Sequence, residues 1–226
     1  MPFVHVTSRI EGRKDDDLAT RKTGSALFPT ILFLDADGEV LLKLGRPALS
    51  AAIGNGGPPI ASFGRKLDAC ERYVALRARA DSGDASAKVD LAVTALEIGK
   101  IDAAAFDAAV AGAELRPEQA MAVARIRANA ICEALVAEVR SRGQDPESEK
   151  AATREFLKLY EKGTHPDSDS ADMYWWLIGT HGKTTGDADM IARSIQGLEA
   201  TGGRERFGPM LAELDAELKR LKARSD

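Results

Sequence analysis

The stretch from residue 27 to residue 45 reads Leu-Phe-Pro-Thr-Ile-Leu-Phe-Leu-Asp-Ala-Asp-Gly-Glu-Val-Leu-Leu-Lys-Leu-Gly, and it decides how the N-terminal part of the chain folds. Residues 31–34 are all apolar, which predicts a strand with both faces buried. Residues 35–38, Asp-Ala-Asp-Gly, predict a tight turn because glycine takes positive φ without strain. Residues 39–44 then predict a returning strand, so the stretch forms a β-hairpin.

Two further elements are expected before this hairpin. Phe3, Val4 and Val6 favour a strand. Residues 15–23 begin with three aspartates and end with basic side chains, which suits the dipole of a short helix. We therefore expect a small α/β unit over residues 1–53.

Phe28-Pro29-Thr30, the apolar strand, the Asp-Gly turn, the second strand and Gly45 resemble the C-terminal half of a thioredoxin fold. The resemblance covers about a quarter of the chain and implies that Pro29 is the cis-proline of that family. A proline that opens a strand ahead of an Asp-Gly turn also occurs in other α/β proteins. If the resemblance holds, Phe28, Pro29 and Thr30 form a protein-docking surface.

The redox motif of thioredoxins, Cys-x-x-Cys, is missing from this sequence. Cys70 and Cys132 stand 62 positions apart, both within helical patterns. The strand that carries the motif in the family is missing too, so the strand at 3–7 either pairs directly with 31–34 or the chain is a fragment of a longer protein. The α/β unit is expected to be redox-inactive as given.

Glycine and proline dominate residues 54–59, which predicts a linker. Beyond it, residues 60–226 read as an antiparallel helical array, because apolar residues recur at helical spacing and the connections are short. The expected helices cover 60–80, 84–99, 102–113, 117–142, 147–162, 170–181, 187–201 and 204–223. The predicted fold class is mainly α, with a small N-terminal α/β unit.

Residues 85–118 resemble one 34-residue tetratricopeptide repeat, and a weaker second unit begins near Asp172. In the second unit, Trp175, Ile178 and Gly179 imitate the Trp-x-x-Leu-Gly opening. A generic antiparallel array explains the small residues about as well. The positions that carry the first resemblance are Leu91, Ala92, Gly99, Ala104, Ala108, Ala111 and Pro117.

Composition excludes several classes of protein. The chain has 226 residues, a net charge of -4 and 44% hydrophobic residues, which is too apolar for a disordered chain and too acidic for a generic nucleic-acid binder. It has no apolar run long enough to span a membrane. The first eight residues lack the features of a signal peptide, which favours the cytoplasm. A start codon further upstream would instead allow a periplasmic or exported protein.

No motif in the sequence indicates a catalytic site, a cofactor or a metal. His181-Gly182-Lys183-Thr184 lacks the earlier glycine of a phosphate loop, so residues 179–186 are expected to be a turn between helices. The three histidines are scattered and do not match the spacing of metal ligands. Cys70 and Cys132 are expected to be buried structural thiols.

Trp175 and Trp176 are the two tryptophans of an aromatic-poor chain. Adjacent helical residues point about 100° apart, so one indole is expected to pack inside and the other to cover a groove or contact a partner. The leading interpretation is a non-catalytic module that binds a protein partner or client. The alternatives are a thiol–disulfide oxidoreductase whose Cys-x-x-Cys half is not in this chain, and a purely structural helical protein.

Overall fold

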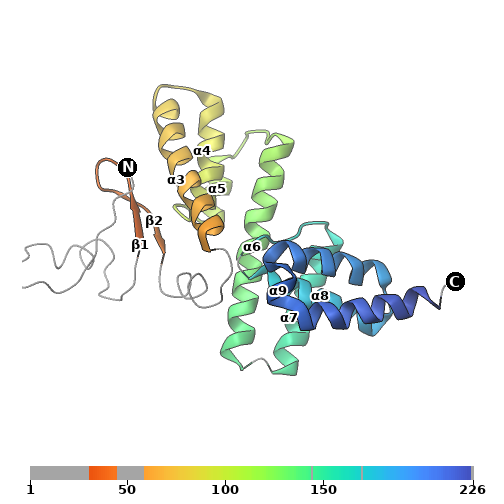
Figure 1. The fold of residues 1–226 in the computed structure, drawn as a ribbon. Coiled ribbons are helices and arrows are strands. Elements are labelled where there is room, and N and C mark those ends of the chain that lie inside the picture. The colour runs from red at the N-terminus through yellow and green to blue at the C-terminus, as the bar shows by residue number, and fades with distance from the viewer. Residues whose placement is uncertain (1–30, 45–58, 144, 169, 225–226) are drawn as a thin grey trace, which may run out of the picture. The chain divides into compact units, whose positions relative to one another are not determined.

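The computed structural model describes residues 31–44, 59–143, 145–168 and 170–224 (Figure 1). These residues form a mainly helical fold with a small two-stranded antiparallel sheet, as the sequence predicts at that level. The elements are β1 (Ile31–Leu34), β2 (Val40–Leu44), α3 (Pro59–Asp81), α4 (Ala85–Glu97), α5 (Ala103–Ala109), α6 (Pro117–Ser141), α7 (Pro146–Glu161), α8 (Ala171–Thr185) and α9 (Ala188–Lys222).

The chain divides into two compact units, Met1–Gln119 and Ala120–Asp226. The division falls in the first turn of α6. The strand predicted at 3–7, the helix predicted at 15–23 and the docking residues Phe28, Pro29 and Thr30 lie outside the described residues, and so does the linker apart from Pro59.

The hairpin of the first unit forms where the sequence predicts it. Gly38 takes a φ of 74°, and the Gly38 amide donates to the carbonyl of Asp35. The strand register shifts between Phe33 and Leu34, so Leu41 has no direct partner on β1. Phe33 is buried but Leu32 and Leu34 are only half-buried, so the expectation of two fully buried faces was wrong for β1.

The hairpin contacts α3 and the end of α4 through a small apolar cluster and a set of ion pairs. The cluster contains Phe33, Leu41, Leu44, Ala69, Cys70 and Ile98. Asp35 accepts a 2.9 Å hydrogen bond from Arg77, and its side chain is only 1% exposed. Glu39 pairs with both Arg77 and Lys100. The polar turn of the hairpin is therefore fixed to the helical part of its unit.

Helices α3 and α4 pack together through small and apolar side chains. Leu76 and Ala80 of α3 contact Ala87 and, more peripherally, Leu91 of α4. Asp84 caps α4 by accepting from the amides of Ser86 and Ala87, as the sequence predicts. Val74 of α3 lies away from these contacts and is 38% exposed.

Helix α5 is shorter than predicted and buries one aromatic side chain. It ends at Ala109 because the chain turns through Val110 and a left-handed Gly112, whose φ is 79°. Phe106 is its buried residue. Three alanines expected at helix contacts, Ala104, Ala108 and Ala111, are exposed.

The second unit has a continuous core made by α6, α7, α8 and α9. Its fully buried large side chains include Phe156, Tyr174, Ile178, Ile191, Leu198, Leu214, Val136, Val139 and Cys132. Phe156 and Tyr174 meet edge to face, with ring centroids 5.3 Å apart. Such dense packing of large and small residues is the main source of order in this unit.

Helix α8 is longer than predicted. The expected turn over 179–186 was wrong, because α8 continues to Thr185 and only Gly186, at φ 73°, ends it. Gly179 and Gly182 lie buried inside the helix, where a Cβ on either would approach α9 side chains at 2.9–3.2 Å. These two glycines therefore serve close helix packing and do not form a turn.

Helix α9 is assigned as one hydrogen-bonded segment of 35 residues, where the sequence predicts two helices. Its contacts show that it reverses direction. A Cβ on Gly179 would lie 3.0 Å from Ser194 and 2.9 Å from Leu214, yet these two residues would be about 30 Å apart on a straight helix. In Figure 1 the blue ribbon of α9 changes direction along its length.

The two limbs of α9, residues 188–201 and 207–222, run in opposite directions along α8. Gly182 meets Met190 and Ile191, whereas Trp175 meets Gly197, so the first limb is antiparallel to α8. The second limb runs parallel to α8, because Gly179 meets Leu214 and Gly186 approaches Leu221. Three helical segments thus lie side by side.

Candidate functional site

Trp175 packs flat on the backbone of α9. A Cβ built on Gly197 would lie 2.1 Å from Cδ2 and 2.2 Å from Cε2 of the indole, so only glycine fits there. The Trp175 side chain is buried, and its ring is tilted against that of His165, with ring centroids 4.9 Å apart. The expectation that one of the two tryptophans packs inside is confirmed for Trp175.

Trp176 lies on another side of α8 and is half-buried. It packs against the periphery of the core, as does Met173 one turn earlier. Its docking role, which the sequence suggests, is not tested by these contacts. Trp176 is the one of the five predicted docking residues that the structure describes and leaves partly accessible.

His165 lies in the loop that joins α7 to α8, within a group of aromatic rings. Its Nδ1 is 2.9 Å from the hydroxyl of Tyr174, a residue that is fully buried. The imidazole also lies near the rings of Tyr160 and Trp175, with centroid separations of 5.6 Å and 4.9 Å. The sequence gives no local signal for this cluster, because its members come from α7, the loop and α8.

The same loop is attached to α6 by polar contacts. The side-chain oxygen of Asn129 accepts from the amides of Asp167 and Ser168 at 2.8 Å and 3.2 Å. The Asn129 amide group donates to the carboxylate of Asp167 at 2.8 Å. The thiol of Cys132 donates to the carbonyl of Ser170 at 3.5 Å. The loop is thereby held between α6 on one side and α8 on the other.

Burial controls the acid–base behaviour of this cluster. Desolvation raises the pKa of the Tyr174 hydroxyl far above its usual range. Desolvation, together with the positive charge of Arg193 on α9, lowers the pKa of His165 below its ordinary 6.5. His165 is therefore favoured in its neutral form at neutral pH.

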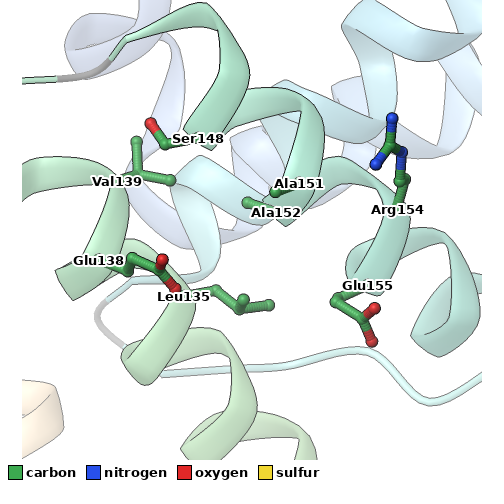
Figure 2. Close-up of a pocket in the computed structure, with 8 residues that line it drawn as sticks. All are labelled: Leu135, Glu138, Val139, Ser148, Ala151, Ala152, Arg154 and Glu155. Carbon is green, nitrogen blue, oxygen red and sulfur yellow. The ribbon is translucent and has the colours of Figure 1, made fainter. Parts of the chain in front are cut away.

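A shallow groove of 250 Å³ lies between α6 and α7 (Figure 2). Figure 2 shows the Leu135 side chain between the carboxylates of Glu138 and Glu155. These two carboxylates form ion pairs with Arg142 and Lys158. The remaining lining residues are Val139, Ser148, Ala151, Ala152 and Arg154.

The polar groups of the groove serve the local helices. The hydroxyl of Ser148 donates to the carbonyl of Asp145 at 2.8 Å. Asp145 in turn caps α7 by accepting from the amides of Glu147 and Ser148. The one hydroxyl among the lining residues, that of Ser148, is therefore engaged at the start of α7.

The two thiols are buried, as the sequence predicts. Burial raises the pKa of Cys132 to about 12 and also raises the pKa of Cys70. A raised pKa disfavours the thiolate, which is the nucleophilic form of cysteine. Both side chains contribute to the apolar core of their units.

Within the part of the chain that the structure describes, no three His, Cys, Asp or Glu side chains gather as metal ligands. Among the described helices, none combines the length and apolar character needed to cross a membrane. Two hydroxyl oxygens, Thr180 Oγ1 and Ser194 Oγ, are buried without a hydrogen-bond partner among the described residues.

Comparison of the chain with protein-family models, with curated proteins and with solved structures found no match. Its function is therefore inferred from its own residues.

Proposed function

We propose that this chain is a non-catalytic protein-interaction module built on a helical array. The observation that carries the proposal is the arrangement of α8 and the two limbs of α9, in which an antiparallel helix pair is followed by a segment parallel to the first helix. Stacked helix pairs of this kind, as in tetratricopeptide repeats, present extended binding surfaces.

The spacing of small residues supports this arrangement. Gly179, Gly182 and Gly197 let α8 approach α9 closely, because a Cβ on Gly197 would overlap the Trp175 indole and a Cβ on either of the others would be crowded. The Trp-x-x-Ile-Gly sequence that begins at Trp175 thus supplies two contacts with α9. Trp175 packs on Gly197, and Gly179 faces Leu214 and Ser194. Helical repeats depend on such contacts between consecutive helices.

Trp176 and Met173 form the surface on α8 that we assign to a protein partner. Both are half-buried and lie one helical turn apart on the same side of the helix. Tryptophan is enriched among the residues that dominate binding energy at interfaces. Phe28, Pro29 and Thr30 of the proposed thioredoxin-like unit would add a second surface.

The buried thiols fit a non-redox role. Neither Cys70 nor Cys132 is exposed to a substrate disulfide, and burial disfavours the thiolate of each. The alternative of a thiol–disulfide oxidoreductase places its redox cysteines outside the given sequence. No observation in the described residues favours it over the interaction module.

The proposal is tested by photo-crosslinking at single positions. A photoreactive amino acid replaces Trp176 in one variant of the full chain, and Met121 in the control. Met121 is 67% exposed and is the most accessible of the described large apolar side chains. Both variants are expressed in the native cells and irradiated.

We expect position 176 to crosslink to one or a few defined polypeptides, and Met121 to give none of these products. Substitution Trp176→Ala, introduced with the photoreactive residue at Met173 one turn earlier, should give about tenfold less of the same products than the Met173 probe alone. Equal crosslinking from positions 176 and 121, or disulfide-reductase turnover by the purified chain, would contradict the proposal.

A further inference from the structure

The hydrogen bond between His165 and Tyr174 has a direction that depends on protonation. The Tyr174 side chain is fully buried, and His165 is the hydrogen-bond partner that the structure shows for its hydroxyl. When the imidazole is neutral with its proton on Nε2, Nδ1 accepts the hydroxyl proton and the pair is satisfied. This tautomer is the one that gives the buried hydroxyl proton of Tyr174 an acceptor.

Protonation of His165 reverses this bond. Nδ1 then carries a proton and donates to the Tyr174 oxygen, so the hydroxyl proton of Tyr174 loses its acceptor. An unsatisfied buried donor is costly because it loses its hydrogen bond to water and gains no hydrogen bond in the protein. The charged imidazole would also lie among the rings of Tyr160 and Trp175, largely away from water.

We infer that the His165–Tyr174 contact is an acid-sensitive attachment that holds the loop between α7 and α8 at neutral pH and releases it on acidification. This device is independent of the proposed interaction function. The loop contains buried Pro166 and is otherwise attached to α6 through Asn129, Cys132 and Arg125. Loss of the His165 contact therefore frees one of the two sides on which the loop is held.

Among the charged groups around the aromatic cluster, Arg193 opposes protonation of His165. Arg193 of α9 faces the aromatic cluster, with its guanidinium 6.0 Å from the Tyr160 ring centre. Its positive charge opposes a second positive charge on His165. Tyr160 and Tyr174 stay neutral because burial raises the pKa of each. The negative charges of Asp187 and Asp189 also raise the pKa of Tyr160. Asp167 in the loop pairs with Arg125 of α6.

The sign of the pH dependence follows from these contacts. The pKa of folded His165 is lowered, so the released loop binds a proton more readily than the attached one. Attachment is strongest above the ordinary histidine pKa of 6.5 and weakens as pH falls below it. The effect is expected between pH 7.5 and 5, above the range in which most carboxylates titrate.

Hydrogen exchange of the Asp167 and Ser168 amides tests this inference, because both donate to Asn129 in the attached loop. Protection factors are measured at pH 7.5 and pH 5 for the full-length wild type, for His165→Gln and for the control His181→Gln. His181 lies within α8 and outside the loop, so its replacement by Gln makes the same chemical change at a second histidine.

In the wild type and in His181→Gln, we expect protection of the two amides to fall about tenfold between pH 7.5 and 5. In His165→Gln the protection should be independent of pH over this range. A direct NMR titration of the wild-type His165 imidazole should give a midpoint below that of an unstructured peptide. Equal pH dependence in wild type and His165→Gln, constant protection in the wild type, or a midpoint at or above the peptide value would overturn the inference.

Discussion

The β1–β2 hairpin of the first unit is held to its helices by charged side chains around a small apolar cluster, whereas α8 and α9 of the second unit meet at glycines. In the hairpin, Asp35 and Glu39 pair with Arg77 and Lys100. In the second unit, the Trp175 indole lies directly on the Gly197 backbone. The two regions therefore differ in how their contacts respond to substitution and pH.

The difference shows two physical ways of fixing a segment to the helices beside it. Ion pairs and charge-assisted hydrogen bonds position a turn even where little apolar surface is buried, but they weaken when a carboxylate is protonated. Close packing at glycine tolerates pH changes and fails when a single methyl group is added. The two kinds of contact can therefore be distinguished by substitution and by pH.

The two thiols provide the first comparison of the units. A pKa of about 12 for Cys132, against an ordinary 9.0, leaves about a thousandfold less thiolate near pH 8, and burial slows access further. Burial also disfavours the thiolate of Cys70 in the first unit. The Cys70 residue is 3% exposed, whereas Cys132 is fully buried. We expect 5,5′-dithiobis(2-nitrobenzoate) to label Cys132 much more slowly than Cys70 in the folded protein, and both equally fast in 6 M urea.

Single-cysteine variants, Cys70→Ser and Cys132→Ser, assign the two rates. Equal labelling of Cys132 in the folded and unfolded chain would show that the core around α6 is not closed as described.

The second experiment adds one methyl group to α9. Gly197→Ala places a Cβ within 2.1–2.5 Å of three indole atoms of Trp175, which must move out of a packed core. We expect the free energy of unfolding to fall by about 3 kcal/mol, the upper end for overpacking. Urea unfolding followed by tryptophan fluorescence measures it, because both tryptophans lie in the second unit.

Gly208→Ala on the same helix is the matched control. A Cβ there meets nothing within 4 Å, and alanine favours helix over glycine by about 1 kcal/mol. We therefore expect it to stabilise the protein slightly. A Gly197→Ala variant as stable as Gly208→Ala would mean that Trp175 does not lie on α9.

The third experiment removes the charge that holds the hairpin. Asp35 accepts hydrogen bonds from the amides of Asp37 and Glu39 and from Arg77. These bonds lower the pKa of Asp35, with the Glu39 amide as the largest cause, so their contribution is complete above its ordinary pKa and is lost as pH falls through the lowered value. Asp35→Ala should reduce amide protection in β1 and β2 about tenfold at pH 7.

Asp35→Asn keeps an acceptor for the two amides and should lose less protection than Asp35→Ala. Exposed Asp37→Asn is the control and should behave as wild type. If all three variants exchange alike, the apolar cluster alone holds the hairpin.

The parts of the fold that the sequence predicts well are those encoded by neighbouring residues. Asp84 and Asp102 accept from the first amides of their helices, and the sequence places the starts of α4 and α5 at these residues. The Asp-Gly turn likewise gave the hairpin and its two strands.

The features that the sequence left undetermined depend on contacts between distant residues. Glycine often indicates a turn, so the sequence around Gly179 and Gly182 predicts one. In the structure both glycines lie within α8, where side chains of α9 pack against them. His165 has no local partner in the sequence, because Tyr174 and Trp175 contact it from α8. The groove between α6 and α7 had no local signal for the same reason.

The reversal of α9 along α8 is the observation on which the proposed function rests, and an electron–electron distance measurement tests it directly. Spin labels are attached at exposed Asp189 and Lys219, each changed to cysteine in a background with Cys70→Ser and Cys132→Ala. Because Gly182 meets Met190 and Gly186 approaches Leu221, we expect a distance below roughly 25 Å. A distribution centred near 45 Å, the length of about 30 residues of straight helix, would contradict the account.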